Sequence, residues 1–362
     1  MAPDERAANA GPAAAALAMT DRVGIVSAYV CPRRGPAAGL GPDRRVARNA
    51  ARLMLERARV WRPEDRRALR ARVAELGRRV DEMLDSGAAP GVVLFGGVAS
   101  GVWREHQLPV PVARSVSFDR RARVLPLVAA LQDARPAGLA VLTLTRITLG
   151  ELRGVALEEV ESTDVTQAID AWRRQRGRRD AGHPLARQPG PERDAFDRGL
   201  EAQVGWVVSS FAHRIAREAR ERGWDRLVVA GNGRLVAVLE RCHPAAGPPL
   251  LELEGGIAAA DGGRVATRAA EALDLERQSV RQRAAEAALE EALARGEDVR
   301  DAGWVAAALD AGRVARLHVD GAADAERLVR GALATSAAIS VVDASPAWRE
   351  RGVAGAIAEL RW

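Results

Sequence analysis

The sequence contains no lysine, so 54 arginines carry all of the positive side-chain charge of its 362 residues, histidine apart. We attribute this absence, together with the abundance of alanine and glycine, to coding bias rather than to mechanism. Only two cysteines are present, Cys31 and Cys242, which excludes a disulfide framework and fits a reducing compartment. No apolar run is long enough to span a membrane, and the alanine-rich residues 13–19 lack the basic region of a signal peptide. These absences predict a cytoplasmic protein.

Catalytic and metal-binding patterns are also missing from the sequence. The five histidines are scattered, and Cys242 and His243 are adjacent, which is poor geometry for one tetrahedral metal ion. No nucleophile elbow occurs, and no serine, histidine and aspartate set can be assembled. The sequence therefore predicts no metal, no cofactor and no catalytic residue of a standard kind.

Charge is unevenly distributed along the chain. The net charge is +6, but residues 33–79 contain fifteen arginines against five acids, whereas residues 259–362 contain fourteen arginines against seventeen acids. A basic front and a slightly acidic back indicate a polyanionic partner on one side only.

Chain length and hydrophobic periodicity predict an α/β protein of two or three domains, after a disordered tail over residues 1–20. Helices are expected at 44–61, 64–84, 124–133, 192–222, 265–293, 299–311 and 323–334, with another after the glycine turn at 233. Strands are expected at 23–30, 92–95, 102–106, 138–145, 147–160, 227–233, 313–319 and 338–342.

The segment Thr163–Pro191 is predicted to be a long basic loop in the middle domain. From residue 171 to 191 it has six arginines and one acid, and three glycines and three prolines exclude a regular element across most of it. Loops of this length inside compact domains are usually functional or disordered. A high density of arginine indicates binding to phosphate groups. The RNA-binding candidates are Arg173, Arg174, Arg176, Arg178, Arg179 and Arg187. The alternative is a solvated insertion that binds nothing.

Several short phrases, in this order, resemble the archaeo-eukaryotic class-1 release factor and Pelota superfamily in its bacterial branch. The phrases are Pro90-Gly-Val-Val-Leu-Phe-Gly-Gly97, Gly138–Leu152, Leu227–Gly233 and the ending Gly352–Trp362. The resemblance covers residues 23–362. It implies three α/β domains, over residues 21–136, 137–258 and 259–362. The middle domain would have an RNase-H-like fold and carry the basic loop, and the last domain would have a layered α/β/α fold.

Two departures from the superfamily's pattern bear on function. Release factors carry Gly-Gly-Gln on the middle-domain loop, whereas residues 163–191 contain neither that tripeptide nor Gly-x-x-Gln. Gln188 is the nearest substitute, but Pro189 follows it where the family has a flexible residue. Residues 46–51 do not match the Asn-Ile-Lys-Ser that reads stop codons in eukaryotic members. The resemblance therefore implies a protein that neither reads stop codons nor releases peptide.

The resemblance implies instead a ribosome A-site-binding factor acting in hibernation or rescue, as does the bacterial hibernation factor Balon. Its partners would be ribosomal RNA, with tRNA and elongation factor Tu or another translational GTPase as further candidates, and no membrane. The alternative is a peptidyl-tRNA hydrolase that uses Gln188. A metal-dependent nuclease is disfavoured, because no cluster of carboxylates suited to two metal ions is visible.

Overall fold

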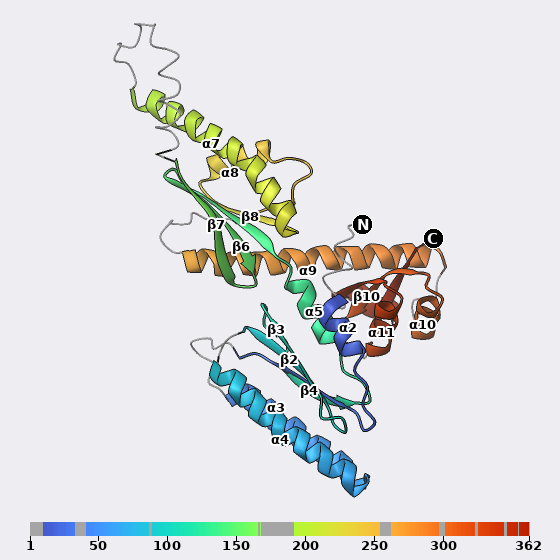
Figure 1. Ribbon diagram of the computed structural model, residues 1–362. Coiled ribbons are helices and arrows are strands. Elements are labelled where there is room, and N and C mark those ends of the chain that lie inside the picture. Colours follow the sequence, from blue (N-terminus) through green and yellow to red (C-terminus); the bar gives the residue numbers. More distant parts are fainter. Residues whose placement is uncertain are drawn as a thin grey trace. The chain divides into compact units, whose positions relative to one another are not determined.

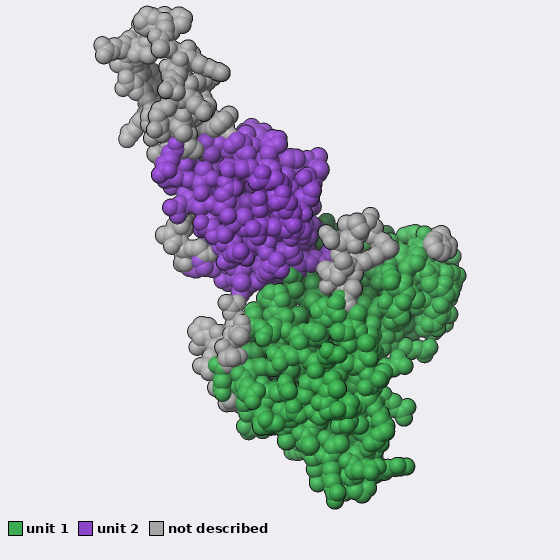
Figure 2. All heavy atoms as spheres, in the orientation of Figure 1, with its two compact units in different colours: residues 1–134, 276–362 green, residues 135–275 purple. Residues whose placement is uncertain are grey.

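The computed structural model divides the chain into two compact units, residues 1–134 with 276–362 and residues 135–275 (Figure 2). The residues that it describes are 10–32, 41–86, 89–165, 167, 192–253, 262–296, 301–322, 325–343, 346–353 and 355–361. The predicted α/β class is confirmed. The division into three domains at residues 136 and 258 stays a prediction.

The first unit contains an antiparallel four-stranded sheet in the order β3-β2-β1-β4. Its strands are β1 (Ile25–Val30), β2 (Gly91–Gly97), β3 (Trp103–Leu108) and β4 (Ser115–Asp119). Strands β1 and β2 are buried along their whole length, so both faces of the sheet are covered at its centre. The edge strand β4 was not expected from the sequence, because its short alternation of serine and apolar residues is a weak strand signal.

Two helices, α3 (Gly41–Arg57) and α4 (Pro63–Ser86), lie side by side over one face of this sheet (Figure 1). A single 3₁₀ turn, Ala58–Val60, joins them. Their apolar residues recur at helical spacing, and buried positions such as Met54, Leu69 and Leu76 pack on the sheet residues Val26, Ala28, Val92 and Leu94. This helix pair agrees closely with the ranges expected from the sequence.

The expected disorder of residues 1–20 is wrong for the part of that segment that the structure describes. Residues Ala10–Leu17 form helix α2, and the side chains of Ala13 and Ala16 are fully buried. Alanine has the highest helix propensity and gives up no side-chain entropy on burial, so an alanine-rich segment can form a closely packed helix. An alanine-rich composition therefore does not by itself indicate a disordered tail.

The first unit also contains a three-stranded sheet in the order β11-β10-β12. The strands are β10 (Val314–Asp320), β11 (Ala338–Val342) and β12 (Ala356–Leu360). Helices α10 (Ala302–Asp310) and α11 (Glu326–Ala334) cover one face, and α12 (Pro346–Arg351) with the later part of α9 (Gly262–Ala294) covers the other. This confirms the expected α/β/α layering of the last part of the chain.

Helix α5 (Leu125–Asp133) connects the two sheets of the first unit. The carboxylate of Glu326 accepts hydrogen bonds from the backbone amides of Val124 (2.6 Å) and Leu125 (3.1 Å), which satisfies two free donors at the helix start. At the other end, the side-chain amide of Gln132 bonds to the backbone of Ile339 and Val341 on β11. One apolar cluster therefore includes residues of both sheets.

The second unit contains a five-stranded sheet in the order β7-β6-β5-β8-β9, in which only β6 runs antiparallel to the rest. The strands are β5 (Ala137–Leu142), β6 (Arg146–Arg153), β7 (Ala156–Asp164), β8 (Leu227–Gly231) and β9 (Leu250–Glu252). Numbered along the chain, this is the order 3-2-1-4-5 with the second strand reversed, as expected for an RNase-H-like domain. The single strand expected over 147–160 is wrong: Gly154, at φ +59°, turns the chain between β6 and β7.

Helices cover both faces of the second sheet. Helix α7 (Glu192–Arg222) and helix α8 (Gly233–Cys242) pack on one face, through residues such as Phe211, Ile215 and Leu235. The first part of α9 packs on the other face through Val265, Ala269 and Leu273.

Candidate nucleic-acid interface

The predicted RNA-binding site lies outside the described residues. This applies to all of its members, Arg173, Arg174, Arg176, Arg178, Arg179 and Arg187, and also to Gln188. The structure therefore describes the two ends from which the segment 168–191 leaves the second unit, and the candidate residues themselves stay predictions.

The strand side of this segment is well fixed. The backbone amide of Val165 donates to the carbonyl of Thr145 (2.9 Å), and the side chain of Val165 is fully buried. The Asp164 carboxylate accepts a hydrogen bond of 3.0 Å from the amide of Gln167, as at the start of a helical turn. The basic segment thus begins from an ordered point at the end of β7.

Arg214 links the end of β7 to helix α7. Its Nη1 lies 2.5 Å from Oε1 of Glu161 on β7, and its guanidinium stacks over the ring of Phe211, 4.8 Å from the centroid. Both partners hold the arginine in one orientation, so this basic residue has a structural role between strand and helix.

A buried carboxylate lies deeper in the same unit. Glu151 on β6 is only 2% exposed, and it receives Nε1 of Trp224 (3.0 Å), Nε of Arg153 (2.6 Å) and Nη1 of Arg222 (3.4 Å). Burial alone would raise the pKa of Glu151, but the hydrogen bonds from Trp224 and Arg153 outweigh it and lower the pKa below its ordinary value. A carboxylate with all these partners is a structural anion and a poor general base at this position.

The glycine turn at residues 231–233 does not offer a phosphate site. Asn232 caps helix α8, its side-chain oxygen accepting from the amides of Arg234 (3.0 Å) and Leu235 (3.4 Å). Two of the donors that could bind a phosphate at this helix start are therefore already engaged, which supports a structural role for the turn.

Cys242 and His243 contact different partners. The Sγ of Cys242 lies 3.1 Å from Oγ of Ser209, and Nε2 of His243 lies 2.8 Å from the carbonyl oxygen of Pro248. Over the part of the chain that the structure describes, no group of three or more histidine, cysteine, aspartate or glutamate residues could hold a metal ion. Within that same part, none of the helices has the length and apolar character needed to cross a bilayer.

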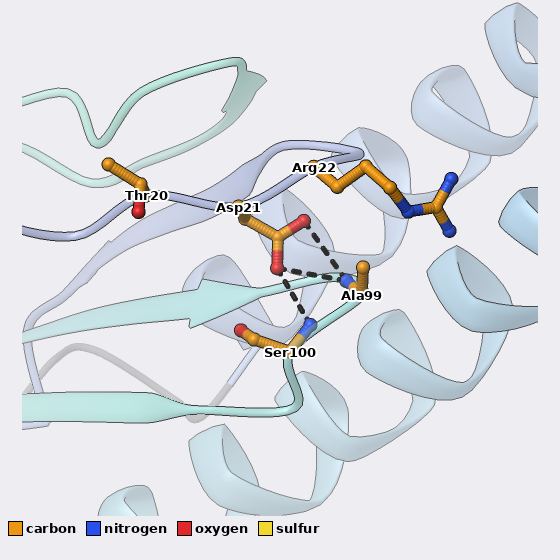
Figure 3. Close-up of a pocket in the computed structure, with 5 residues that line it drawn as sticks. All are labelled: Thr20, Asp21, Arg22, Ala99 and Ser100. Atoms are coloured by element: carbon orange, nitrogen blue, oxygen red, sulfur yellow. Dashed lines mark hydrogen bonds between the residues drawn. The ribbon is translucent and has the colours of Figure 1, made fainter.

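An open pocket in the first unit is lined by Thr20, Asp21, Arg22, Ala99 and Ser100 (Figure 3). The carboxylate of Asp21 accepts from the amides of Ala99 (3.0 Å) and Ser100 (2.8 Å), and also from those of Val23 and Gly24. Burial opposes its ionisation, but these four backbone donors prevail and lower the pKa of Asp21 from 3.8 to about 2.

This pocket therefore has a structural carboxylate as its main polar group. Asp21 ties the segment before β1 to the turn between β2 and β3, and its acceptor positions face backbone donors. Arg22 extends away from it in Figure 3 and pairs with Asp65 of α4 at 2.8 Å. A group so committed does not make a catalytic acid or base.

Helices α3 and α4 are rich in arginine. These helices account for most of the fifteen arginines of residues 33–79, and the exposed ones include Arg45, Arg48, Arg52, Arg67, Arg70 and Arg78. The charge count of the sequence located this region, but it did not single out which side chains face solvent.

Comparison with known proteins gives one family match. Residues 123–288, from the start of α5 into α9, match the family described as bacterial archaeo-eukaryotic release factor family 10. No curated protein matches the chain.

Solved structures give more distant similarities. An archaeal translation termination factor, aRF1, is 18% identical, with 100% of this chain and 99% of that chain covered and a TM-score of 0.26. Ribosome-bound archaeal Pelota, described together with ABCE1, is 13% identical, with 75% and 77% covered and a TM-score of 0.38. Dom34 of S. cerevisiae, described as a translation termination-like factor in RNA quality control that interacts with Hbs1, is 9% identical, with 77% and 82% covered and a TM-score of 0.36.

Proposed function

We propose that this chain, whose residues 123–288 match bacterial archaeo-eukaryotic release factor family 10, is a release-factor-like protein that binds the ribosomal A site without releasing the nascent peptide. The family match carries the proposal. The matching family is described by its likeness to release factors, and this description supports a role at the ribosome.

The missing release motif supports the second half of the proposal. Neither the segment between β7 and α7 nor any other part of the sequence contains Gly-Gly-Gln. In that motif the paired glycines allow the backbone to approach the ester bond closely, and a proline after Gln188 does not restore that freedom. Occupation of the A site without peptide release fits hibernation or rescue of stalled ribosomes in the cytoplasm.

The arginine-rich segment 173–187 is proposed to bind ribosomal RNA or tRNA. Arginine pairs with phosphate and stacks on unpaired bases, so a dense arginine segment suits structured RNA with single-stranded junctions. Replacing Arg173, Arg174, Arg176, Arg178 and Arg179 by alanine should weaken ribosome binding. The salt dependence should flatten by roughly 0.7–0.9 log units of slope per lost phosphate contact. Superimposable salt curves for the wild type and this variant would contradict an RNA-binding role for the segment.

A translational GTPase such as elongation factor Tu is the proposed protein partner of the last third of the chain. The slight excess of acids over arginines in residues 259–362 separates this region from the basic front of the chain. Such an asymmetry suits one partner of RNA and one of protein. Co-purification of elongation factor Tu with the tagged full chain tests it.

Sedimentation through sucrose gradients is the decisive test of the proposed function. Lysates of starved and growing cells should show the protein in the ribosomal fractions, more strongly in starvation if its role is hibernation. A protein that remains at the top of the gradient in both conditions would overturn the proposal.

A peptide-release assay with purified ribosomes separates this proposal from the hydrolase alternative. We expect no release by the wild type. Release by the wild type that is lost in Gln188→Ala would establish an enzyme and contradict the proposal.

A further inference from the structure

Helices α3 and α4 expose two rows of arginine on the side away from their sheet. Arg45, Arg48 and Arg52 follow at intervals of three and four, so they form one stripe along α3. Arg67, Arg70 and Arg78 form a matching stripe along α4. All six side chains are exposed, whereas apolar residues such as Met54, Leu69 and Leu76 are buried on the sheet. We call these six residues the outer arginine face.

The outer arginine face is not neutralised within the described parts of the protein. None of its six members makes an ion pair within 4 Å with a described residue. A row of like charges on a helix is repulsive by a few tenths of a kcal/mol per pair. The six charges therefore repel one another, and no ion pair with a described residue offsets this repulsion.

Two other arginines of α4, Arg72 and Arg79, have partners within the fold, and we call them the inner arginines. Arg72 and Arg79 both stack on the ring of Trp103, at 5.2 and 5.1 Å from its centroid. Glu75 lies between them, 2.5 Å from Nη1 of Arg72 and 3.2 Å from Nε of Arg79. These contacts fix α4 to strand β3, so the two inner arginines serve the fold.

We propose that the outer arginine face is an RNA-binding surface that contacts the phosphate backbone of a duplex region, separately from the segment 173–187. The identity of the RNA as ribosomal rests on the proposed function, whereas the binding itself rests on the outer arginine face.

The spacing of the arginines fits a phosphate backbone. At a rise of about 1.5 Å per residue, the α3 row spans roughly 10 Å and the α4 row roughly 16 Å along the helix axis. Each row therefore offers several guanidinium groups in line, on a rigid support, to a regular array of phosphates. Guanidinium binds phosphate through paired N–H donors, which suits such contacts.

A membrane surface and an acidic protein suit this face less well. Helices that bind membranes insert an apolar face, but the apolar faces of α3 and α4 are buried on the sheet. Protein interfaces depend on apolar or aromatic anchors in pockets. On the described part of this helix pair, the exposed large apolar side chains are Leu53, at 53%, and Val60, at 90% in the turn. Neither of them belongs to the two rows of arginine.

The test replaces all six arginines of the outer arginine face by glutamine in the full chain. The measurement is fluorescence anisotropy with a labelled 20-base-pair RNA duplex of arbitrary sequence, over about 50–200 mM salt. We expect at least a tenfold loss of affinity at the middle of this range. The slope of log affinity against log salt should fall by roughly 0.9 for each phosphate contact removed.

A matched control removes the same charge elsewhere. It replaces Arg146, Arg220, Arg241, Arg313, Arg327 and Arg349 by glutamine; these residues are also exposed and make no ion pair within 4 Å with a described residue. This control should keep the affinity and slope of the wild type within about twofold. Thermal melting of both variants should match the wild type, since exposed charges contribute little to stability.

Three outcomes would overturn the proposal. Equal losses in the variant and in the control would show that net charge alone matters. Duplex binding by the wild type that the variant retains would place the RNA contact elsewhere. Binding of the wild type to vesicles of phosphatidylserine and phosphatidylcholine, but not to RNA, would identify a membrane surface.

Failure of this proposal differs from failure of the proposed function. If the variant binds no duplex but the wild type never sediments with ribosomes, the outer arginine face binds RNA and the ribosomal assignment is wrong. If the wild type sediments with ribosomes and the variant does so equally, with unchanged duplex binding, the proposed function stands and the outer arginine face is not the contact.

Discussion

The indole Nε1 of Trp224 donates a 3.0 Å hydrogen bond to Oε2 of Glu151, a carboxylate that is 2% exposed inside the second unit. Arg153 pairs with Oε1 of the same carboxylate, and Arg222 pairs with its Oε2. Replacing Glu151 by alanine would leave the indole N–H without its acceptor and two arginines without their buried partner.

We therefore expect Glu151→Ala to destabilise the second unit by roughly 3 kcal/mol. The pKa of Glu151 is lowered in the folded protein, so its stabilisation is present above the ordinary value of 4.5 and is lost as the pH falls through the folded value. Urea unfolding between pH 7 and pH 3 measures both effects. A variant that unfolds at the wild-type urea concentration, with the same pH dependence, would contradict this role.

Asp21→Asn should weaken the attachment of the segment before β1 to the turn after β2. An asparagine offers one acceptor oxygen to the four backbone donors and turns an N–H₂ group toward the others, at an expected cost of about 1–3 kcal/mol. Because the folded pKa of Asp21 is about 2, the wild type should lose this advantage between about pH 4 and pH 2. The gap in melting temperature between wild type and variant should accordingly narrow over that window. A constant gap would argue against the carboxylate as its cause.

Gly77→Ala should stabilise the protein by about 0.5–1 kcal/mol, since glycine inside a helix is costly. A Cβ at this position in α4 would meet no atom within 4 Å. Gly231→Ala is the opposite case, because Gly231 has φ +124° and a Cβ there would clash with the carbonyl of Leu142. Thermal melting should move the two variants in opposite directions, and a shift of both in one direction would contradict this prediction.

Glu326→Gln tests the capping of helix α5. Burial raises the pKa of Glu326 despite the hydrogen bonds from the amides of Val124 and Leu125. A carboxylate with a raised folded pKa binds its proton more tightly when folded, so its contribution to stability falls as the pH rises through the window above 4.5. Both Glu326→Gln and Glu326→Ala should lack this pH dependence, and Glu326→Ala should be about 1–2 kcal/mol less stable than Glu326→Gln, because its helix start has lost the side-chain acceptor. Urea unfolding of the wild type and both variants at pH 5 and pH 8 measures the two effects. Equal pH dependence in wild type and Glu326→Gln would disprove the assignment.

The sequence predicts best those elements whose periodicity is long and uninterrupted. Helices α3, α4 and α7 and strand β11 match their expected ranges closely, because each buries one regular apolar pattern. The short strands β4 and β9 were missed, since three to five residues carry too little pattern to distinguish a strand from a loop. Helix α2 was missed because its alanines pack through contacts with residues far along the chain.

The candidate site, like the fold, was only partly predictable from the sequence. The excess of arginine over residues 33–79 is visible in the sequence, but the distinction between Arg72, stacked on Trp103, and Arg70, turned to solvent, depends on the packing of α4 against β3. The partners of Asp21 on the turn after β2 lie 78 and 79 residues away, so local sequence could not reveal them. The arginines of residues 173–187 remain predictions from the sequence alone.

The contact of Gln132 with β11 also has a consequence for association between molecules. Strand β11 is an edge strand, and edges with free backbone groups pair readily with other chains. The side-chain amide of Gln132 occupies the carbonyl of Ile339 and the amide of Val341, which takes the place of a neighbouring strand at that point. Helix α5 therefore acts as a guard against aggregation. A variant with a detached α5 would expose a sheet edge able to add strands from further copies of the chain.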